Sequence, residues 1–162
     1  MPEESERYSF KNLELWKAAQ RFAVDVCTLA DSLTSKRSAD VAARQLIRSA
    51  TSVAANIAEG HGRFSLQAYA NYLSIAKASA TESRSWIDLL MRLGHISAEK
   101  GADLDAQCAR LVAALTRRIT QLEGQARSRR VRENGPSYDA TSGEVPRFEG
   151  SKVQDDADGA GL

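Results

Sequence analysis

Polar residues capable of chemistry gather where an alanine-rich apolar stretch gives way to glycine. Asn56 and Glu59 are three positions apart and share one face of a helix. Arg63 follows Gly60 and Gly62 and can fold back onto Glu59. This group fits a hydrogen-bonded clasp at a helix–helix corner, a polar pocket or phosphate contact, or a catalytic carboxylate. One Glu without a second carboxylate or a nearby base is weak support for acid–base chemistry, so we favour the clasp and expect no catalytic residue.

Other reactive residues do not form a recognisable centre. The Gly-x-Gly is not preceded by a predicted strand or followed by Lys-Ser/Thr, so it does not predict a phosphate-binding loop. His61 and His95 are expected at exposed turns and lack a metal-ligand spacing. Cys27 and Cys108 each fall on an apolar stripe and are interpreted as small buried hydrophobes. We therefore expect no metal, no cofactor and no enzymatic activity.

The basic residues offer a different chemistry, which is contact with phosphate. Tyr69 and Tyr72 lie three apart, with Arg48 nearby if the second and third helices pair. Aromatic rings beside arginine can stack bases, although packing is favoured here. The series near the C-terminus fits either a solvated helix face or phosphate binding. The candidate nucleic-acid-binding residues are Arg48, Arg110, Arg117, Arg118, Arg127, Arg129, Arg130 and Arg132.

These residues depend on helices for their placement. The three prolines are Pro2, Pro136 and Pro146, so no proline interrupts helices between Pro2 and Pro136. Apolar residues at helical spacing predict four helices. The first begins near the N-cap Ser9, and residues 32–39 form a loop. The second covers about 40–58 and is stopped by Gly60 and Gly62 in a left-handed cap. The third follows Ser65 and is ended by Gly94. The fourth follows Ser97 and stops at Gly124 or continues into the arginines. The sequence predicts an all-α fold, an antiparallel up-down four-helix bundle.

Composition sets the remaining boundaries. We expect a flexible N-terminus at 1–8, one bundle domain at 9–124, and a disordered tail at 125–162 that is basic and then acidic, with Asp155, Asp156 and Asp158 near its end. Hydrophobic residues make up 43%, enough for a packed core, and the net charge of +1 gives no strong global attraction to nucleic acid or membrane. No apolar stretch is long enough for a signal core or membrane span, so a cytoplasmic protein is expected.

The central motif resembles a known family, the four helix bundle or 23S rRNA intervening-sequence protein family. It reads Gln45-Leu46-x-Arg48-x-Ala50-x-Ser52-Val53, then Asn56-Ile57-Ala58-Glu59-Gly60-x-Gly62-Arg63-x-Ser65. The similarity covers about residues 9–123. The chain departs from the family pattern at Ile47-Arg48, where two arginines are usual, at Ala54, where proline is usual, and in the loop at 33–38.

The resemblance implies up-down four-helix bundles that assemble as rings, typically homopentamers, without catalytic activity. Relatives are encoded within large-subunit rRNA genes of some bacteria. They include the accessory variability determinant of diversity-generating retroelements, which binds nucleic acid and partners a reverse transcriptase. We therefore expect a non-enzymatic homo-oligomer that binds RNA or DNA through its arginines. The more specific form of this expectation is an accessory subunit of a retroelement reverse transcriptase. The alternative is a protein–protein interaction scaffold that binds no nucleic acid.

Overall fold

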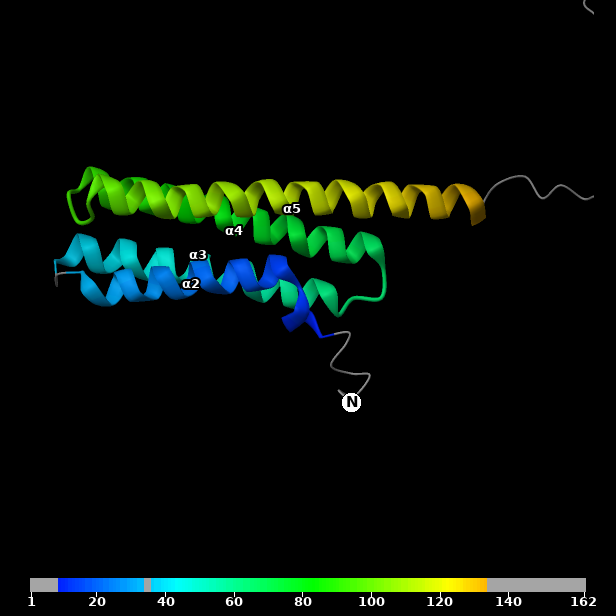
Figure 1. Ribbon diagram of the computed structural model, residues 1–162, viewed down its shortest axis with the longest axis horizontal. Coiled ribbons are helices and arrows are strands. Elements are labelled where there is room, and N and C mark those ends of the chain that lie inside the picture. The colour runs from blue at the N-terminus through cyan, green and yellow to red at the C-terminus, as the bar shows by residue number, and fades with distance from the viewer. Residues whose placement is uncertain (1–8, 34–35, 134–162) are drawn as a thin grey trace, which may run out of the picture.

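The computed structural model describes residues 9–33 and 36–133, which form an all-α bundle. A short 3-10 helix, η1 (Phe10–Asn12), precedes α2 (Glu14–Ser32), α3 (Arg37–His61), α4 (Leu66–Arg92) and α5 (Ala98–Glu133). Consecutive helices pack side by side and run in opposite directions, with α2 and α3 below α4 and α5 in Figure 1. The first and last long helices, α2 and α5, make the weakest of the four helix–helix contacts. The predicted antiparallel four-helix bundle is confirmed.

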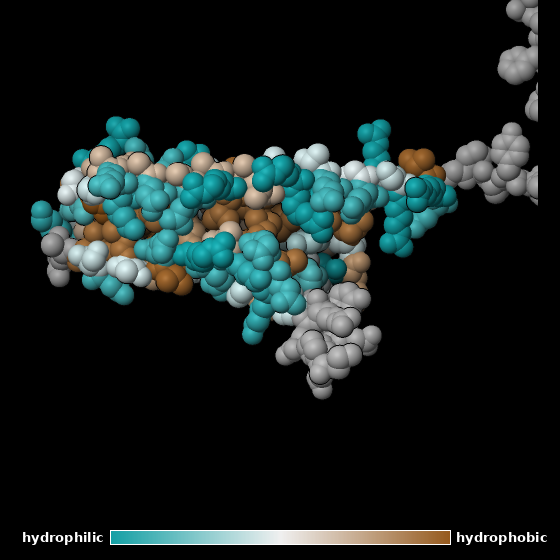
Figure 2. Space-filling model, viewed as in Figure 1, coloured by the Kyte–Doolittle hydropathy of each residue, from teal (hydrophilic) through white to brown (hydrophobic). Residues whose placement is uncertain are grey.

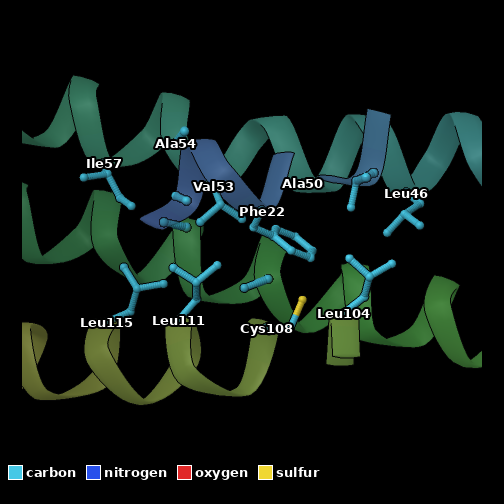
Figure 3. Close-up of a cluster of buried hydrophobic side chains, with 14 of the residues drawn as sticks. Phe22, Leu46, Ala50, Val53, Ala54, Ile57, Leu104, Cys108, Leu111 and Leu115 are labelled. Carbon is cyan, nitrogen blue, oxygen red and sulfur yellow. The ribbon is translucent and has the colours of Figure 1, made fainter. Parts of the chain in front are cut away.

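The core is built from the apolar stripe of each helix. Phe22 of α2 lies at its centre, between Leu46 and Val53 of α3 and Leu104 and Cys108 of α5 (Figure 3). All five side chains are at most 1% exposed. Burying a Leu or Phe side chain contributes about 1.5–3 kcal/mol, so this layer is a major source of stability.

The helix starts follow local capping chemistry. Ser65 Oγ accepts from the amide of Ala68 at 3.1 Å, and Ser97 Oγ accepts from the amide of Lys100 at 3.2 Å, as expected for N-caps. Ser9 caps η1 instead of the long helix, because its Oγ accepts from Lys11 at 3.3 Å. The 3-10 turn brings Phe10 edge-on to Trp16, with ring centroids 5.1 Å apart. The first long helix therefore begins later than predicted.

The glycines near the helix ends have different roles, and the left-handed cap predicted for Gly60 and Gly62 was wrong. Gly60 lies inside α3, which continues to His61, and it is buried. Gly62 caps α3 with φ −78°, so neither residue is left-handed. Gly94 is left-handed, at φ 70°, and ends α4 as predicted. There the amides of Gly94 and His95 donate to Met91 and Leu90 at 2.9 Å, which satisfies the last carbonyls of α4.

Gly60 is explained by a close approach of two helices. A Cβ at this position would lie 2.7 Å from Tyr72 Cβ and 2.9 Å from Tyr69 Cδ2. Residue 60 must therefore lack a side chain for α3 and α4 to pack at this distance, and this need is independent of helix termination.

The last helix continues into the arginines, which is the second of the two predicted alternatives. It runs through Gly124 to Glu133, so residues 125–133 are helical and the expected stop at Gly124 was wrong. In Figure 1, α5 extends past the turn that joins α3 to α4. The calls for residues 1–8 and 134–162 lie outside the described residues.

Candidate functional site

The predicted clasp forms, but with a different third member. The Arg63 guanidinium donates to the Glu59 carboxylate and to the Tyr72 hydroxyl, and it lies 4.5 Å from the centre of the Tyr72 ring. The Tyr72 hydroxyl donates to Glu59 Oε1 at 2.8 Å. We call Glu59, Arg63 and Tyr72 the clasp; it joins the end of α3 to the start of α4.

The electrostatics of the clasp suit a structural role. Its hydrogen bond to Glu59 raises the pKa of Tyr72, because ionising the phenol would remove the donated proton. The ion-paired side chains of Arg63 and Glu59 are 41% and 54% exposed, so water screens their attraction. A carboxylate held by a guanidinium and a phenol is poorly suited to accept a proton from a substrate.

Asn56 does not join the clasp, contrary to the expected grouping. Its side-chain amide reaches back one helical turn and donates to Ser52 O at 2.8 Å and Ser52 Oγ at 3.0 Å. Ser52 Oγ lies 3.1 Å from Ser79 Oγ, and Ser49 Oγ lies 2.8 Å from Ser83 Oγ.

We call Ser49, Ser52, Ser79 and Ser83 the serine seam, and its small hydroxyl side chains line the contact between α3 and α4. Three of the hydroxyls also lie within donating distance of a carbonyl of their own helix: Ser49 of Leu46, Ser79 of Ile75 and Ser83 of Ser79. Each hydroxyl has one proton, so within the Ser49–Ser83 pair one hydroxyl donates to its own helix and the other to its partner. No side-chain polar atom in the described ranges is buried without a partner. The seam therefore holds the two helices together at little electrostatic cost.

Arg48 is neutralised by a neighbour and does not approach the tyrosines. Its guanidinium donates to Glu82 Oε1 at 2.8 Å and to Gln45 Oε1 at 3.0 Å. Trp86 Nε1 donates to the same Glu82 oxygen at 3.2 Å. The carboxylate thus offsets the charge of Arg48, which weakens its case as a phosphate contact. The expected neighbourhood of Arg48 with Tyr69 and Tyr72 was wrong.

The arginines of α5 fall into three groups. Arg118 lies 5.7 Å from the centre of the Tyr69 ring and donates to Gln121 Oε1 at 2.7 Å. Arg129 pairs with Glu133 at 2.9 Å. The other five are exposed, and within the described part of the chain no carboxylate pairs with them: Arg110, Arg117, Arg127, Arg130 and Arg132. We call Arg127, Arg130 and Arg132 the tip arginines.

A hollow of about 640 Å³ separates α2 from α5; we call it the α2–α5 hollow. Leu15, Ala18, Leu111 and Ala114 contribute apolar lining, and Figure 2 shows apolar surface between the polar side chains of the two helices. Three arginines also line it: Arg21 from α2, and Arg110 and Arg117 from α5. The sequence did not identify Arg21 as a candidate, because it shows only a basic residue on an amphipathic helix at this position.

A second exposed feature is apolar. Val41, Trp86, Leu89 and Leu93 surround a shallow hollow at the α3 start and α4 end, and we call these four residues the apolar patch. Phe64, in the turn at the opposite end of the same helix pair, is fully exposed. Exposed apolar groups that gather in this way are typical of protein contact surfaces.

The remaining candidates have local partners. His61 is half-buried and meets Tyr69 edge-on at 6.1 Å, and the half-buried His95 lies 2.9 Å from Ser38 Oγ, so neither is as exposed as expected. Cys108 is buried, as predicted, but Cys27 is only half-buried, and both thiols are free. Among the residues described, no three His, Cys, Asp or Glu side chains are grouped to hold a metal ion. No helix in the same ranges is long and apolar enough to cross a membrane.

Comparison with known proteins identifies a family and similar solved structures. The family model for 23S rRNA-intervening sequence protein matches residues 11–117. A Bacteroides thetaiotaomicron protein of unknown function from the S23 ribosomal protein family is 28% identical, with a TM-score of 0.61. That similarity covers 65% of this chain and 97% of the other. No curated protein matches the sequence. The tip arginines lie outside the matched residues.

Proposed function

The chain belongs to the 23S rRNA-intervening sequence protein family, and on that premise we propose that it binds RNA through unpaired arginines of α5. One observation carries the proposal: α5 continues as a helix to Glu133, so the tip arginines stand on helical turns that project beyond the bundle. None of the three has an ion-pair partner within 9–33 and 36–133. The resemblance to relatives that bind nucleic acid supports a polyanionic ligand, and RNA is the one that we propose.

The mechanism is recognition of the sugar–phosphate backbone. Arginine forks match phosphate oxygens and carry no base information, so binding has little sequence preference. In contrast, five arginines of α3, α4 and the turn between them are each paired with a carboxylate: Arg44, Arg48, Arg63, Arg84 and Arg92. Free positive charge therefore belongs to α5 more than to the α3–α4 side, and α5 is the side that we expect to face RNA.

Fluorescence anisotropy of a labelled single-stranded RNA, at several salt concentrations, tests this function. Replacing the three tip arginines by alanine should weaken binding and reduce the salt slope by about 0.7 for each of them that contacts a phosphate of the single strand. A matched control removes three other cations that have no described ion pair, Lys36, Arg37 and Lys77, and should leave most of the affinity. Binding by the parent that is absent, or insensitive to salt, would contradict the proposal.

Self-association is the second part of the proposal, and the apolar patch supports it. Phe64 and the patch lie at opposite ends of the α3–α4 pair, so Phe64 of one copy can pack on the patch of another. Such a head-to-tail contact closes into a ring when the rotation allows it. A ring would also repeat the arginines and strengthen RNA binding by avidity.

Light scattering after size exclusion measures this association directly. Phe64→Ser should lower the mass of the particle, whereas Val24→Ser, at an exposed valine of α2, should leave it unchanged. If the chain associates and binds no RNA, the scaffold alternative is the better description. A monomeric parent would remove the self-association proposal. The reverse-transcriptase partner stays a prediction of the resemblance.

A further inference from the structure

We propose that a single RNA strand lies along one face of α5 and enters the α2–α5 hollow, where Arg21 of α2 forms the opposite wall. This inference rests on the proposed function and names the path of the ligand. It adds two positions that the sequence did not single out as contacts, Arg21 and Gly124.

The face is defined by helix geometry. At 100° per residue, Arg110, Arg117, Gln121, Ser128 and Arg132 fall within an arc of about 60°. The buried residues Leu104, Leu115 and Leu122 point about 110° away from the centre of that arc, toward the core. From Arg110 to Arg132 the helix rises through 22 steps, which at 1.5 Å each is about 33 Å. Arg110 and Arg117 stand toward one end of this face and Arg132 toward the other, with polar residues between them. The other two tip arginines, Arg127 and Arg130, point away from the face.

Two hollows lie along this face. The first is the α2–α5 hollow, and the second, of about 560 Å³, is lined by Gln121, Gly124, Ser128 and Arg132 among others. A Cβ at Gly124 would have no atom within 4 Å, so the helix surface is low at this point. The low point lies between Arg117 of the first hollow and Arg132 near the helix end. A strand that contacts both arginines must pass over it.

The charges that line the first hollow favour an anion. Glu14 also lines it, but its carboxylate accepts from Lys17 Nζ at 2.8 Å, which lowers its pKa. Asp25 accepts from Gln107 Nε2 at 3.0 Å. Arg21, Arg110 and Arg117 have no carboxylate partner in the described residues. The lining therefore carries three guanidinium groups against the two carboxylates of Glu14 and Asp25, a net charge of +1, and Lys17 further offsets Glu14.

The apolar lining favours a single strand over a duplex. An unpaired base has two flat apolar faces that can rest on Leu15, Ala18 and Leu111 or stack on a guanidinium. A duplex keeps those faces stacked inside and presents phosphates and groove edges. At the 3.4 Å phosphate spacing of a stacked strand, the face holds at most about ten nucleotides.

The experiment compares single-residue variants on a labelled ten-nucleotide RNA, and on the same RNA annealed to its complement. Arg21→Ala should weaken single-strand binding several-fold and reduce the salt slope by about 0.7. Arg37→Ala, an exposed arginine at the start of α3, is the charge-matched control and should have little effect. Gly124→Leu should weaken binding more than Gly124→Ala, since only the larger side chain fills the second hollow.

The outcomes separate this inference from the function on which it rests. If the parent binds no RNA at low salt, the proposed function fails. If the parent binds, and the tip arginines matter while Arg21→Ala and Gly124→Leu bind like the parent, only the path is overturned. Equal affinity for the duplex would also overturn the path. Far-UV circular dichroism of each variant shows that the helices are retained, so that lost binding reports on contact.

Discussion

Substituting Gly60 by alanine tests the explanation of why the chain has glycine inside α3. In an ordinary helix interior this change stabilises by about 1 kcal/mol, because alanine has the higher helix propensity. At this site the new Cβ would lie 2.7 Å from Tyr72 Cβ and 2.9 Å from Tyr69 Cδ2. Two carbons prefer a separation of about 3.5–4.0 Å, so α3 and α4 must move apart by roughly 1 Å.

The magnitude follows from these opposing effects. Tyr72 Cβ is fixed to its backbone and cannot rotate away, so the contact is relieved only by moving a helix. Inserting a methyl group into a packed contact costs typically about 1–3 kcal/mol, and separating the helices also lengthens the nearby serine-seam contacts. After the propensity gain, we expect a net loss of up to about 2 kcal/mol in the free energy of unfolding.

Gly124→Ala is the matched control, since its Cβ meets nothing within 4 Å. This variant should gain up to about 1 kcal/mol. The two variants should then differ by roughly 1–3 kcal/mol, or about 2–12 °C in melting temperature for a chain of this size. The assay is thermal and urea unfolding followed by circular dichroism at one protein concentration, because self-association would shift both curves. A Gly60→Ala protein that melts at or above the parent would refute the close-approach argument.

Three further predictions concern buried or hydrogen-bonded groups. Burial raises the pKa of Cys108 to about 12, while an unfolded thiol ionises near pH 8.5. The stability that this group contributes is therefore full below about pH 8.5 and falls as pH rises toward 12. Between about pH 7 and pH 10, urea unfolding should show a smaller loss of unfolding free energy for Cys108→Ala than for the parent. Tyrosine absorbance during alkaline titration should contain a component above pH 10 that disappears in Tyr72→Phe, because the phenol donates to Glu59; an unchanged curve would contradict the clasp. A double-mutant cycle of Ser49→Ala and Ser83→Ala should give a coupling of about 0.5–1 kcal/mol, since one of the two hydroxyls donates to the other, and zero coupling would show that both donate to their own helices and the pair adds nothing.

The parts of the fold that sequence predicts are the parts decided locally. Ser65 and Ser97 cap the helices that follow them, and Gly94 ends α4, because those interactions involve residues at most five positions apart. The apolar stripes likewise mark which face of each helix is buried. Gly60 was misread because its reason is Tyr72, a residue of the next helix, and no local pattern distinguishes a packing glycine from a terminating one.

The candidate site was less predictable, for the same physical reason. Arg48 and Glu82 are 34 positions apart, and their pairing depends on how α3 and α4 are rotated about their axes. Arg21 shares a hollow with Arg110 because the first and last helices are neighbours, which a periodic pattern alone does not specify. The clasp was partly predictable, since Glu59 and Arg63 are four positions apart, but its tyrosine was not.

The end of α5 has a consequence for amide hydrogen exchange. Leu122 is the last buried residue of the helix, and from Glu123 to Glu133 no side chain is buried. Without tertiary packing, these turns open by local fraying, so their amide protons should exchange with solvent far faster than those of the bundle. A bound polyanion that neutralised the closely spaced guanidinium groups would slow that exchange, which makes this segment an intrinsic reporter of occupancy.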